Sequence, residues 1–403
     1  MFTPTFTQRF SANAATVLTL AKAAVKADTF GVGAVLVDPA GAVIAMDRNR
    51  LWPTAFHANP TAHAEMGVMR NYYQRRNQGE DLPPPEQCTI ISSLDPCIMC
   101  AGAVMQGNFK QISLSHDPHA GVSRFGSNRY ITLPAALRKK AERSFAITGV
   151  TDGPRFFGDK TGIPPQSINR AMADAAFDLF YRGSQRLGEK LRQQRGWGIR
   201  VQENPVDMPA QMRDRLRSLF SDSLDITTAP ENPSGSLLYR LRALANHAKA
   251  DGHQANAAAL VHPSGHVLLA VSGREAEVPL DTPLMRLTRL YDSARGDFGK
   301  EGFAWLPSRA ACTVVTFRDF DASPTGVMEI GMLRSQAFHV TAPSAPRDLA
   351  RVIAALPINY GLNDETTPRQ VTRPPVGASC MQPECQHGAR SSLFTRLIAS
   401  PST

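Results

Sequence analysis

The residue types that could do chemistry gather in two short motifs. His63 and Glu65 belong to the first, and Cys97 and Cys100 belong to the second. Imidazole and thiolate groups are preferred ligands of zinc, and a catalytic zinc keeps three protein ligands and leaves its fourth position to water. We therefore expect one Zn²⁺ per chain, held by His63, Cys97 and Cys100.

Glu65 has the position of a proton carrier rather than of a fourth ligand. Zinc lowers the pKa of its bound water from about 15.7 towards about 7, and a neighbouring carboxylate can take the proton that is released. Glu65 would pass that proton to a ring nitrogen and then to a leaving ammonia. A His-x-Glu motif followed by Pro-Cys-x-x-Cys is the signature of zinc-dependent base deaminases. A purely structural zinc would have no use for Glu65.

The elements around these motifs alternate between helices and strands. The free N–H groups of a helical first turn stabilise thiolates, so we expect helices to begin near His63 and at Cys97. Alternation of this kind predicts an α/β/α layered domain. The predicted helices are 11–27, 63–77, one opening at 96–97, and 166–195; the predicted strands are 32–37, 42–46, 89–93, 111–115 and 145–150.

Three segments resemble a known family. They are GVGAVLV at 31–37, NPTAHAEM at 59–66 and PCIMCAGA at 96–103. Together they resemble the cytidine and deoxycytidylate deaminase superfamily, in particular the branch of bacterial tRNA adenosine deaminases, guanine deaminases and fungal cytosine deaminase. The likeness covers roughly residues 7–195. It implies a three-layer α/β/α cytidine-deaminase-like sandwich with a central mixed sheet.

The resemblance also implies roles for single residues. His63, Cys97 and Cys100 match the zinc ligands of the family, and Glu65 matches its proton shuttle. By the same likeness, three further residues would meet the substrate: Asn49 through a hydrogen bond to the base, Ala64 through its backbone, and Asp117 near the sugar. The chain departs from the tRNA enzymes in a longer 49–63 stretch, an inserted 78–87 loop and an aspartate at Asp95.

The sequence also contains an internal repeat. LVDPAGAVIA at 36–45 aligns with LVHPSGHVLLA from 260, and residues 88–104 align with 312–328 at the same offset of 224. The deaminase-like fold is therefore expected twice in tandem. In the second copy the motif residues are replaced by Thr282, Leu284, Asp321 and Pro324, which cannot rebuild a zinc site.

The predicted domains follow from this repeat. They are a catalytic domain at 1–200, a linker at 201–234, a degenerate deaminase-like domain at 235–360 and a disordered tail at 361–403. The degenerate domain could replace a dimer partner, or it could be kept only for stability. A homodimer of the whole chain is also possible.

The charge and hydropathy of the chain indicate which kinds of partner it could bind, but they do not identify a substrate. The chain has 403 residues, a formal net charge of +9 and a pI near 9.4. Between residues 138 and 200 there are 13 Lys and Arg against 6 Asp and Glu, which could meet phosphates or form a solvated helix face. No apolar run reaches the ~18 residues of a membrane span. The N-terminus does not have the pattern of a signal peptide, so we expect the cytoplasm.

Three functions remain open at this stage. The first is a hydrolase of the C–N bond in a cyclic amidine, which deaminates a free nucleobase, nucleoside or nucleotide. The second is a deaminase of tRNA, other RNA or single-stranded DNA, with the basic 138–200 segment holding the strand. The third is a non-catalytic subunit with a structural zinc.

Overall fold

The computed structural model of the chain describes residues 4–54, 56–117, 121–123, 130, 133–148, 170–195, 197–229, 232–317, 323–332, 336–339 and 347–348, and the statements below concern these residues. We call residues 4–195 the first unit and residues 205–348 the second unit. Each unit contains one five-stranded sheet.

The first unit is built on a mixed sheet with the strand order β2-β1-β3-β4-β5. β1 is antiparallel to β2 and to β3, whereas β3, β4 and β5 run parallel to one another. β1 and β3 are buried along their whole length, which explains why their apolar residues do not alternate with exposed polar ones. The strands are β1 (Gly33–Val37), β2 (Val43–Arg48), β3 (Thr89–Leu94), β4 (Lys110–Ser115) and β5 (Phe145–Ile147).

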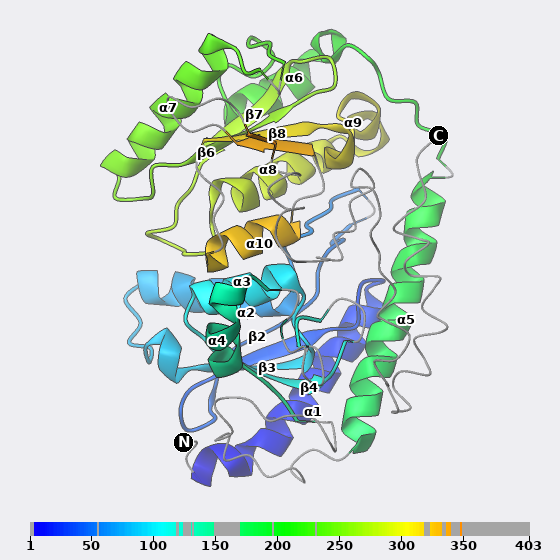
Figure 1. Cartoon of the computed structure of the whole chain (residues 1–403). Helices are drawn as coiled ribbons and strands as arrows, with labels where there is room; N and C mark the ends of the chain where they lie inside the picture. Colours follow the sequence, from blue (N-terminus) through cyan, green and yellow to red (C-terminus); the bar gives the residue numbers. More distant parts are fainter. Residues whose placement is uncertain are drawn as a thin grey trace.

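Helices cover both faces of this sheet (Figure 1). α1 (Pro4–Lys26) and α5 (Arg170–Arg195) lie side by side on one face. α2 (Ala64–Asn77), α3 (Ile98–Gln106) and α4 (Ala135–Ser144) cover the other. This arrangement confirms the predicted three-layer α/β/α architecture with a mixed central sheet.

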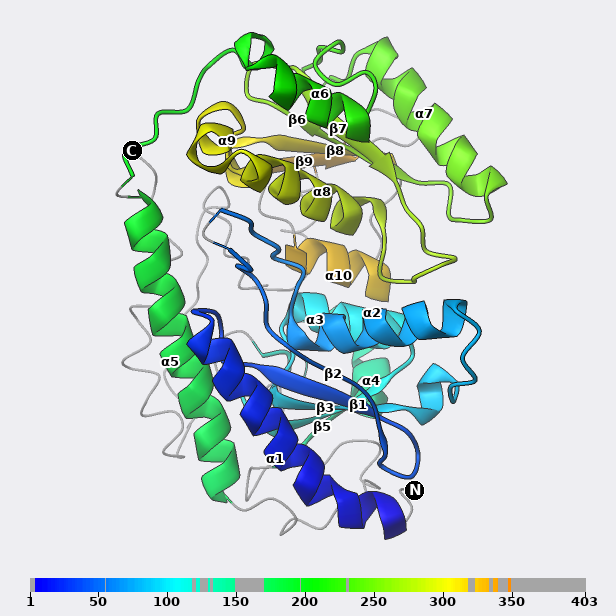
Figure 2. The same cartoon turned by 180° about the vertical axis from the view of Figure 1, so that it is seen from behind.

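The second unit has a sheet with the order β7-β6-β8-β9-β10. Its strands are β6 (Ala257–Val261), β7 (Val267–Ser272), β8 (Thr313–Phe317), β9 (Gln336–His339) and β10 (Arg347–Asp348). Its helices are α6 (Ala210–Leu219), α7 (Gly235–Ala250), α8 (Pro283–Asp297), α9 (Gly299–Trp305) and α10 (Pro324–Met332). Figure 2 shows α8 and α10 on the side of this sheet that faces the first unit.

The two sheets have closely similar strand pairing. Gly33 pairs with Arg48 in the first sheet, and Ala257 pairs with Ser272 in the second, both 224 residues later. Both hairpins shift register at the same place, between the last two residues of their first strand. The fifth strands differ, because β5 is parallel to β4 whereas β10 is antiparallel to β9. A tandem duplication remains a prediction, and this pairing supports it.

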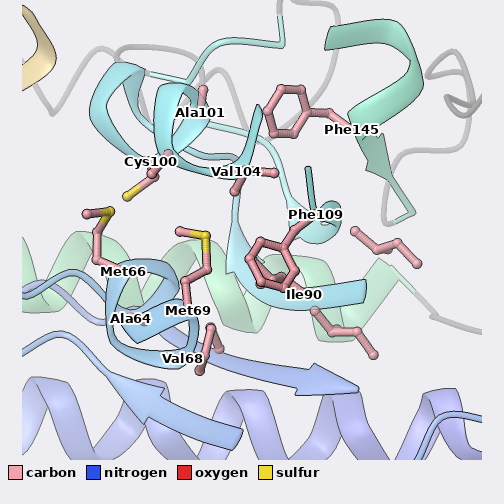
Figure 3. Packing of buried hydrophobic residues seen from close by; sticks show 14 of the residues in the cluster. Ala64, Met66, Val68, Met69, Ile90, Cys100, Ala101, Val104, Phe109 and Phe145 are labelled. Carbon is pink, nitrogen blue, oxygen red and sulfur yellow. The ribbon is translucent and has the colours of Figure 1, made fainter. Parts of the chain in front are cut away.

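The units meet through α3 and α10, which pack on each other (Figures 1 and 2). Two glycines allow the close approach: a Cβ on Gly102 would lie 2.3 Å from the Met328 nitrogen, and one on Gly331 would lie 2.3 Å from the Met99 nitrogen. The main core of the first unit, part of which Figure 3 shows around Met66, extends into the second unit through a few residues. These are Leu280, Met285, Val327, Met328 and Met332.

The observed boundaries refine several predictions. The first helix begins at Pro4 rather than at residue 11, because Phe6 and Phe10 continue its buried face. The predicted linker contains α6, and α6 contributes Met212 and Leu216 to the core of the second unit. The limits of the two domains stay a prediction, and the 361–403 tail lies outside the described residues. In the described part of the chain, no helix has the length and apolar character to cross a membrane.

Candidate metal centre

Two helix N-termini bring the three ligand candidates together. His63 is the N-cap residue of α2, and Cys97 is the N-cap residue of α3, both with extended backbone. Cys100 lies in the first turn of α3. Because the free N–H groups of a first turn carry partial positive charge, this placement suits two sulfur atoms that must lose their protons to bind a metal.

The ligand atoms have the spacing of a tetrahedral zinc site. The His63 Nδ1 atom lies 3.7 Å from Cys97 Sγ and 3.5 Å from Cys100 Sγ. Zn–S and Zn–N bonds of about 2.3 and 2.0 Å at a tetrahedral angle separate N and S by about 3.5 Å. The three ligand atoms all lie within 4.8 Å of one another. The residues present therefore fit a zinc ion.

The two thiols differ in acidity. A hydrogen bond from Cys100 and the nearby charge of His63 hold the pKa of Cys97 well below its usual range. Burial raises the pKa of Cys100, and so do the adjacent Cys97 and Glu65. Because zinc binds thiolates, binding of the metal would release the protons that these thiols still hold.

Glu65 lies beside the three ligand candidates. Its side chain is buried, Ser92 Oγ donates to its Oε1 at 2.9 Å, and Cys100 Sγ lies 3.5 Å from its Oε2. Burial raises the pKa of Glu65, while the charge of His63 and the bond from Ser92 act in the opposite direction. A raised pKa suits a carboxyl group that must hold a proton and then release it.

Asn49 and Ala64 are in direct contact. The Ala64 N–H donates to Asn49 Oδ1 at 2.7 Å, and both residues are fully buried. This bond anchors the N-terminus of α2 to the end of β2 and holds the chain next to His63. It also occupies the Ala64 amide, so a contact between that amide and a substrate would have to replace it.

A loop after β4 lies at the same edge of the sheet. Asp117 is buried, and its carbonyl accepts from the Gly121 N–H at 3.2 Å. Asp95, next to Pro96, accepts from the Ser123 N–H through Oδ2 at 3.1 Å and so ties this loop to the start of α3. Residues 118–120 lie outside the described part, and the substrate role of Asp117 stays a prediction.

Two residues that support the site had no role in the sequence-based prediction. Ser92 orients Glu65, and its only signal was a polar side chain within a buried strand. Arg70, on the second turn of α2, donates to the carbonyl of Thr61 at 3.2 Å and lies 3.6 Å from Asp281 of the second unit. Burial lowers the pKa of Arg70 to about 10.

In the second unit, the described residues at the corresponding positions have structural roles. Thr282 is the N-cap residue of α8, where His63 caps α2, and its side chain accepts from the Met285 N–H. Leu284 is buried, Pro324 begins α10, and Asp321 lies outside the described residues. Among the described residues, only His63, Cys97 and Cys100 form a group of three or more His, Cys, Asp or Glu side chains close enough to share a metal.

Solved structures with detectable likeness to the chain include two kinds of deaminase. A tRNA:A34 deaminase structure is 29% identical and aligns with 29% of this chain and 85% of its own, with a TM-score of 0.25. A guanine deaminase from Nitrosomonas europaea is 21% identical over 45% of this chain and 85% of its own, with a TM-score of 0.26. A guanine deaminase from Bacillus subtilis is 29% identical over 26% and 62%, with a TM-score of 0.22.

Sequence comparison finds a likeness to one family over part of the chain. The tRNA-specific adenosine deaminase of Haemophilus influenzae is 36% identical over 90 residues, which are 22% of this chain and 48% of that protein. The chain thus spans about half the length of this curated relative. Residues 7–116, which include the three ligand candidates and Glu65, match the cytidine and deoxycytidylate deaminase zinc-binding region. Through this region the chain is similar to the cytidine and deoxycytidylate deaminase superfamily.

Proposed function

We propose that this protein is a zinc-dependent hydrolytic deaminase that replaces the exocyclic amino group of a nucleobase-type ring with a carbonyl and releases ammonia. The observation that carries the proposal is the position of Glu65: its carboxylate lies 3.5 Å from Cys100 Sγ, next to three atoms with zinc-like spacing. A structural metal site gains nothing from a buried carboxylate at this place, whereas a hydrolytic site needs one.

Each step uses a residue of the first unit. A zinc ion held by His63, Cys97 and Cys100 would supply Lewis acidity and lower the pKa of a water in the site. Glu65 takes a proton from the attacking water and delivers it to the ring nitrogen beside the amino-bearing carbon. It then takes the proton of the newly added hydroxyl group and passes it to the amino group, which leaves as ammonia while the carbonyl forms. Ser92 keeps the carboxylate of Glu65 pointed at the ligands during both transfers.

Asn49 is proposed to bind the base. Its Oδ1 accepts from Ala64, so the Nδ2 group remains as the donor that could meet a ring carbonyl or nitrogen. Asp117 is proposed to approach the substrate from the loop after β4. We propose a small nucleobase-containing compound as substrate, because the 49–63 stretch, which is longer than in the tRNA enzymes that the sequence resembles, contacts the second unit through His57.

Nucleic acid is the second candidate substrate. Arg182 and Arg186 on α5 have side chains that are 65% and 53% exposed, as a strand-binding surface requires. Each of them already pairs with an aspartate, Asp178 and Asp28 respectively, which reduces the charge left for phosphates. A salt titration separates the candidates, since binding through phosphates weakens steeply as salt rises.

Ammonia release from a panel of bases, nucleosides, nucleotides and single-stranded oligonucleotides tests the proposal. The Glu65→Gln variant should keep one zinc per chain and lose at least about a thousandfold in kcat, as expected for loss of a general acid–base group. Glu80→Gln is the matched control, because Glu80 is exposed at the end of α2 and pairs only with Arg75 among described residues. Full activity in Glu65→Gln would exclude the mechanism, and two zinc ions per chain would exclude a second unit without a metal.

A further inference from the structure

The loop that joins β2 to α2 connects the metal centre to the second unit. It starts after Asn49 and ends at His63. Its two arms are paired near their base, where the Arg50 N–H donates to the Ala62 carbonyl at 2.9 Å and the Asn59 N–H donates to the Leu51 carbonyl at 2.7 Å. Figures 1 and 2 both show this loop, in blue, rising past α10 towards α8 and α9. We call residues 50–62 the bridging loop.

A hydrogen bond between His57 and Asp297 and a close backbone contact hold the tip of the bridging loop. His57 Nε2 lies 3.0 Å from Asp297 Oδ1 at the end of α8, and Arg215 of α6 donates to the other carboxylate oxygen at 2.8 Å. Gly296 lies against the same place, since a Cβ on it would be 2.9 Å from the His57 Cα atom and 2.9 Å from the Phe56 carbonyl oxygen. Any side chain at position 296 would displace the loop.

Aromatic rings complete this contact. The ring of Phe56 lies 5.2 Å from that of Trp197 and 6.3 Å from that of Phe303, centroid to centroid. The guanidinium of Arg295 covers the ring of Phe303 at 3.8 Å. Such ring pairs stabilise a contact beyond the area they bury. The tip is therefore fixed by groups from α6, α8, α9 and the segment after α5.

The position of the tip affects both ends of the bridging loop. Asn49 and His63 flank the loop directly, and the paired arms transmit a displacement of the tip to its base. Arg70 adds a second link, because it contacts Thr61 in the loop and Asp281 in the second unit. A loop of this length without such anchors would sample several conformations next to the metal centre.

We infer that the second unit positions the bridging loop through Asp297 and thereby sets how substrate binds at the metal centre. Asp297 is a positioning residue, since it acts through His57 and does not reach the ligands. The effect on substrate binding rests on the proposed function, whereas the ordering of the loop does not. The second unit thus has a role in the site although its own motif residues are replaced.

Proteolysis and fluorescence test the ordering independently of activity. Arg50 has a side chain that is 58% exposed, and its peptide bond to Leu51 is a trypsin site at the base of the loop. All three tryptophans report on this region: Trp52 lies in the loop, Trp197 in the aromatic cluster and Trp305 at the end of α9. Asp297→Ala should raise the rate of cleavage after Arg50 about tenfold and change the tryptophan emission.

Asp225→Ala is the matched control, because Asp225 also pairs with an arginine of α6, Arg217 at 2.8 Å, without contacting the loop. The double variant His57→Ala/Asp297→Ala should be no more susceptible than either single variant, as expected for two partners in one contact. Cleavage of Asp297→Ala at the rate of the Asp225→Ala control would overturn the inference.

The kinetic arm uses the substrate found in the ammonia assay. Asp297→Ala should keep its zinc and raise KM about tenfold, with kcat changed less than threefold, since the loop positions substrate and not the proton carrier. An unchanged KM would overturn the effect on binding. If no variant and no wild-type protein releases ammonia while the cleavage difference persists, the proposed function fails and the loop ordering stands.

Discussion

Cys97 and Cys88 both lie next to β3, yet their surroundings give them opposite acidity. Cys88 is fully buried among apolar side chains, and burial raises its pKa to about 12. Cys312, at the corresponding place in the second unit, has its pKa raised to about 12 for the same reason. Cys97 instead receives a hydrogen bond from Cys100 and lies by His63, so its pKa falls. Environment, and not residue type, decides which cysteine can bind a metal.

Thiol labelling at single-residue resolution should follow this difference. In the zinc-loaded protein at pH 8, Cys97 and Cys100 should resist an alkylating reagent, and a chelator should make Cys97 react quickly, because its thiolate is then free. Cys88 and Cys312 should stay unlabelled in both states. Peptide mapping by mass spectrometry measures each site. Equal labelling of Cys97 with and without chelator would contradict the assigned ligands.

Whether the role of a site residue could be predicted from the sequence depends on how far away its partner lies along the chain. His63, Glu65, Cys97 and Cys100 could be predicted, because they lie in two short motifs at helix starts and their chemistry is readable from type and spacing. Ser92, Arg70 and His57 could not, because each acts on a partner 9 to 240 residues away. A polar side chain in a buried strand shows only that a partner exists, without naming it.

Among the elements, β6 and β7 form a hairpin whose turn depends on an unprotonated histidine. His262 Nδ1 accepts from the Ser264 N–H at 3.0 Å, where Asp38 in the first unit accepts from the Ala40 N–H at 2.8 Å. His262 and Asp38 are 224 residues apart, so the two side chains make the same turn contact. Burial, together with the charge of His266, lowers the pKa of His262 to about 4.

This hairpin should make stability depend on pH. Unfolded histidine has a pKa of about 6.5, so between that value and about 4 only the unfolded chain binds the proton. Stability is therefore lost as pH falls through this window, by about 1 kcal/mol at pH 5.5. His262→Asp, which copies Asp38, should remove this loss. Urea unfolding at pH 7.5 and 5.5 measures it, and an identical pH dependence in the variant would count against the assignment.

Helix and strand positions were largely predictable, because buried strands and amphipathic helices leave period-specific patterns. The helix starts at His63 and Cys97 agree within one residue with α2 and α3. The packing of α3 on α10 was not predictable, because Gly102 and Gly331 are 229 residues apart. A glycine within a helix does not indicate which other helix packs against it. Only the fold shows that both glycines serve one contact.

The α3–α10 contact should be intolerant of a single methyl group. Gly331→Ala places a Cβ atom 2.3 Å from the backbone nitrogen of Met99, so overpacking should cost about 1–3 kcal/mol of unfolding free energy. Gly235→Ala is the control, because Gly235 is also a helical glycine but has no heavy atom within 4 Å of such a Cβ. The control should be neutral or stabilising by up to about 1 kcal/mol. Equal unfolding free energies for the two variants would show that the contact can relax.

In the whole molecule, the two units pack together and share part of one hydrophobic core. They meet through helices at matching places in their sheets, α3 after β3 and α10 after β8, and the core of the first unit includes apolar side chains from the second. Two copies of one fold would place their contact helices at matching positions in this way. An internal partner of this kind supports our proposal that the second unit serves the metal centre of the first.

A shared core has a thermodynamic consequence, which calorimetry can measure. Because Leu280, Val327 and Met328 pack with residues of the first unit, neither half can unfold without exposing apolar surface of the other. The zinc-loaded protein should therefore unfold in one transition, and removal of zinc should lower its midpoint by about 5 °C, as loss of a ligand bound at about a thousand times its Kd predicts. Glu65→Gln, which keeps the three ligands, should show the same shift. Two separate transitions, of which a chelator moves only one, would mean that the units are independent and that the second does not support the first.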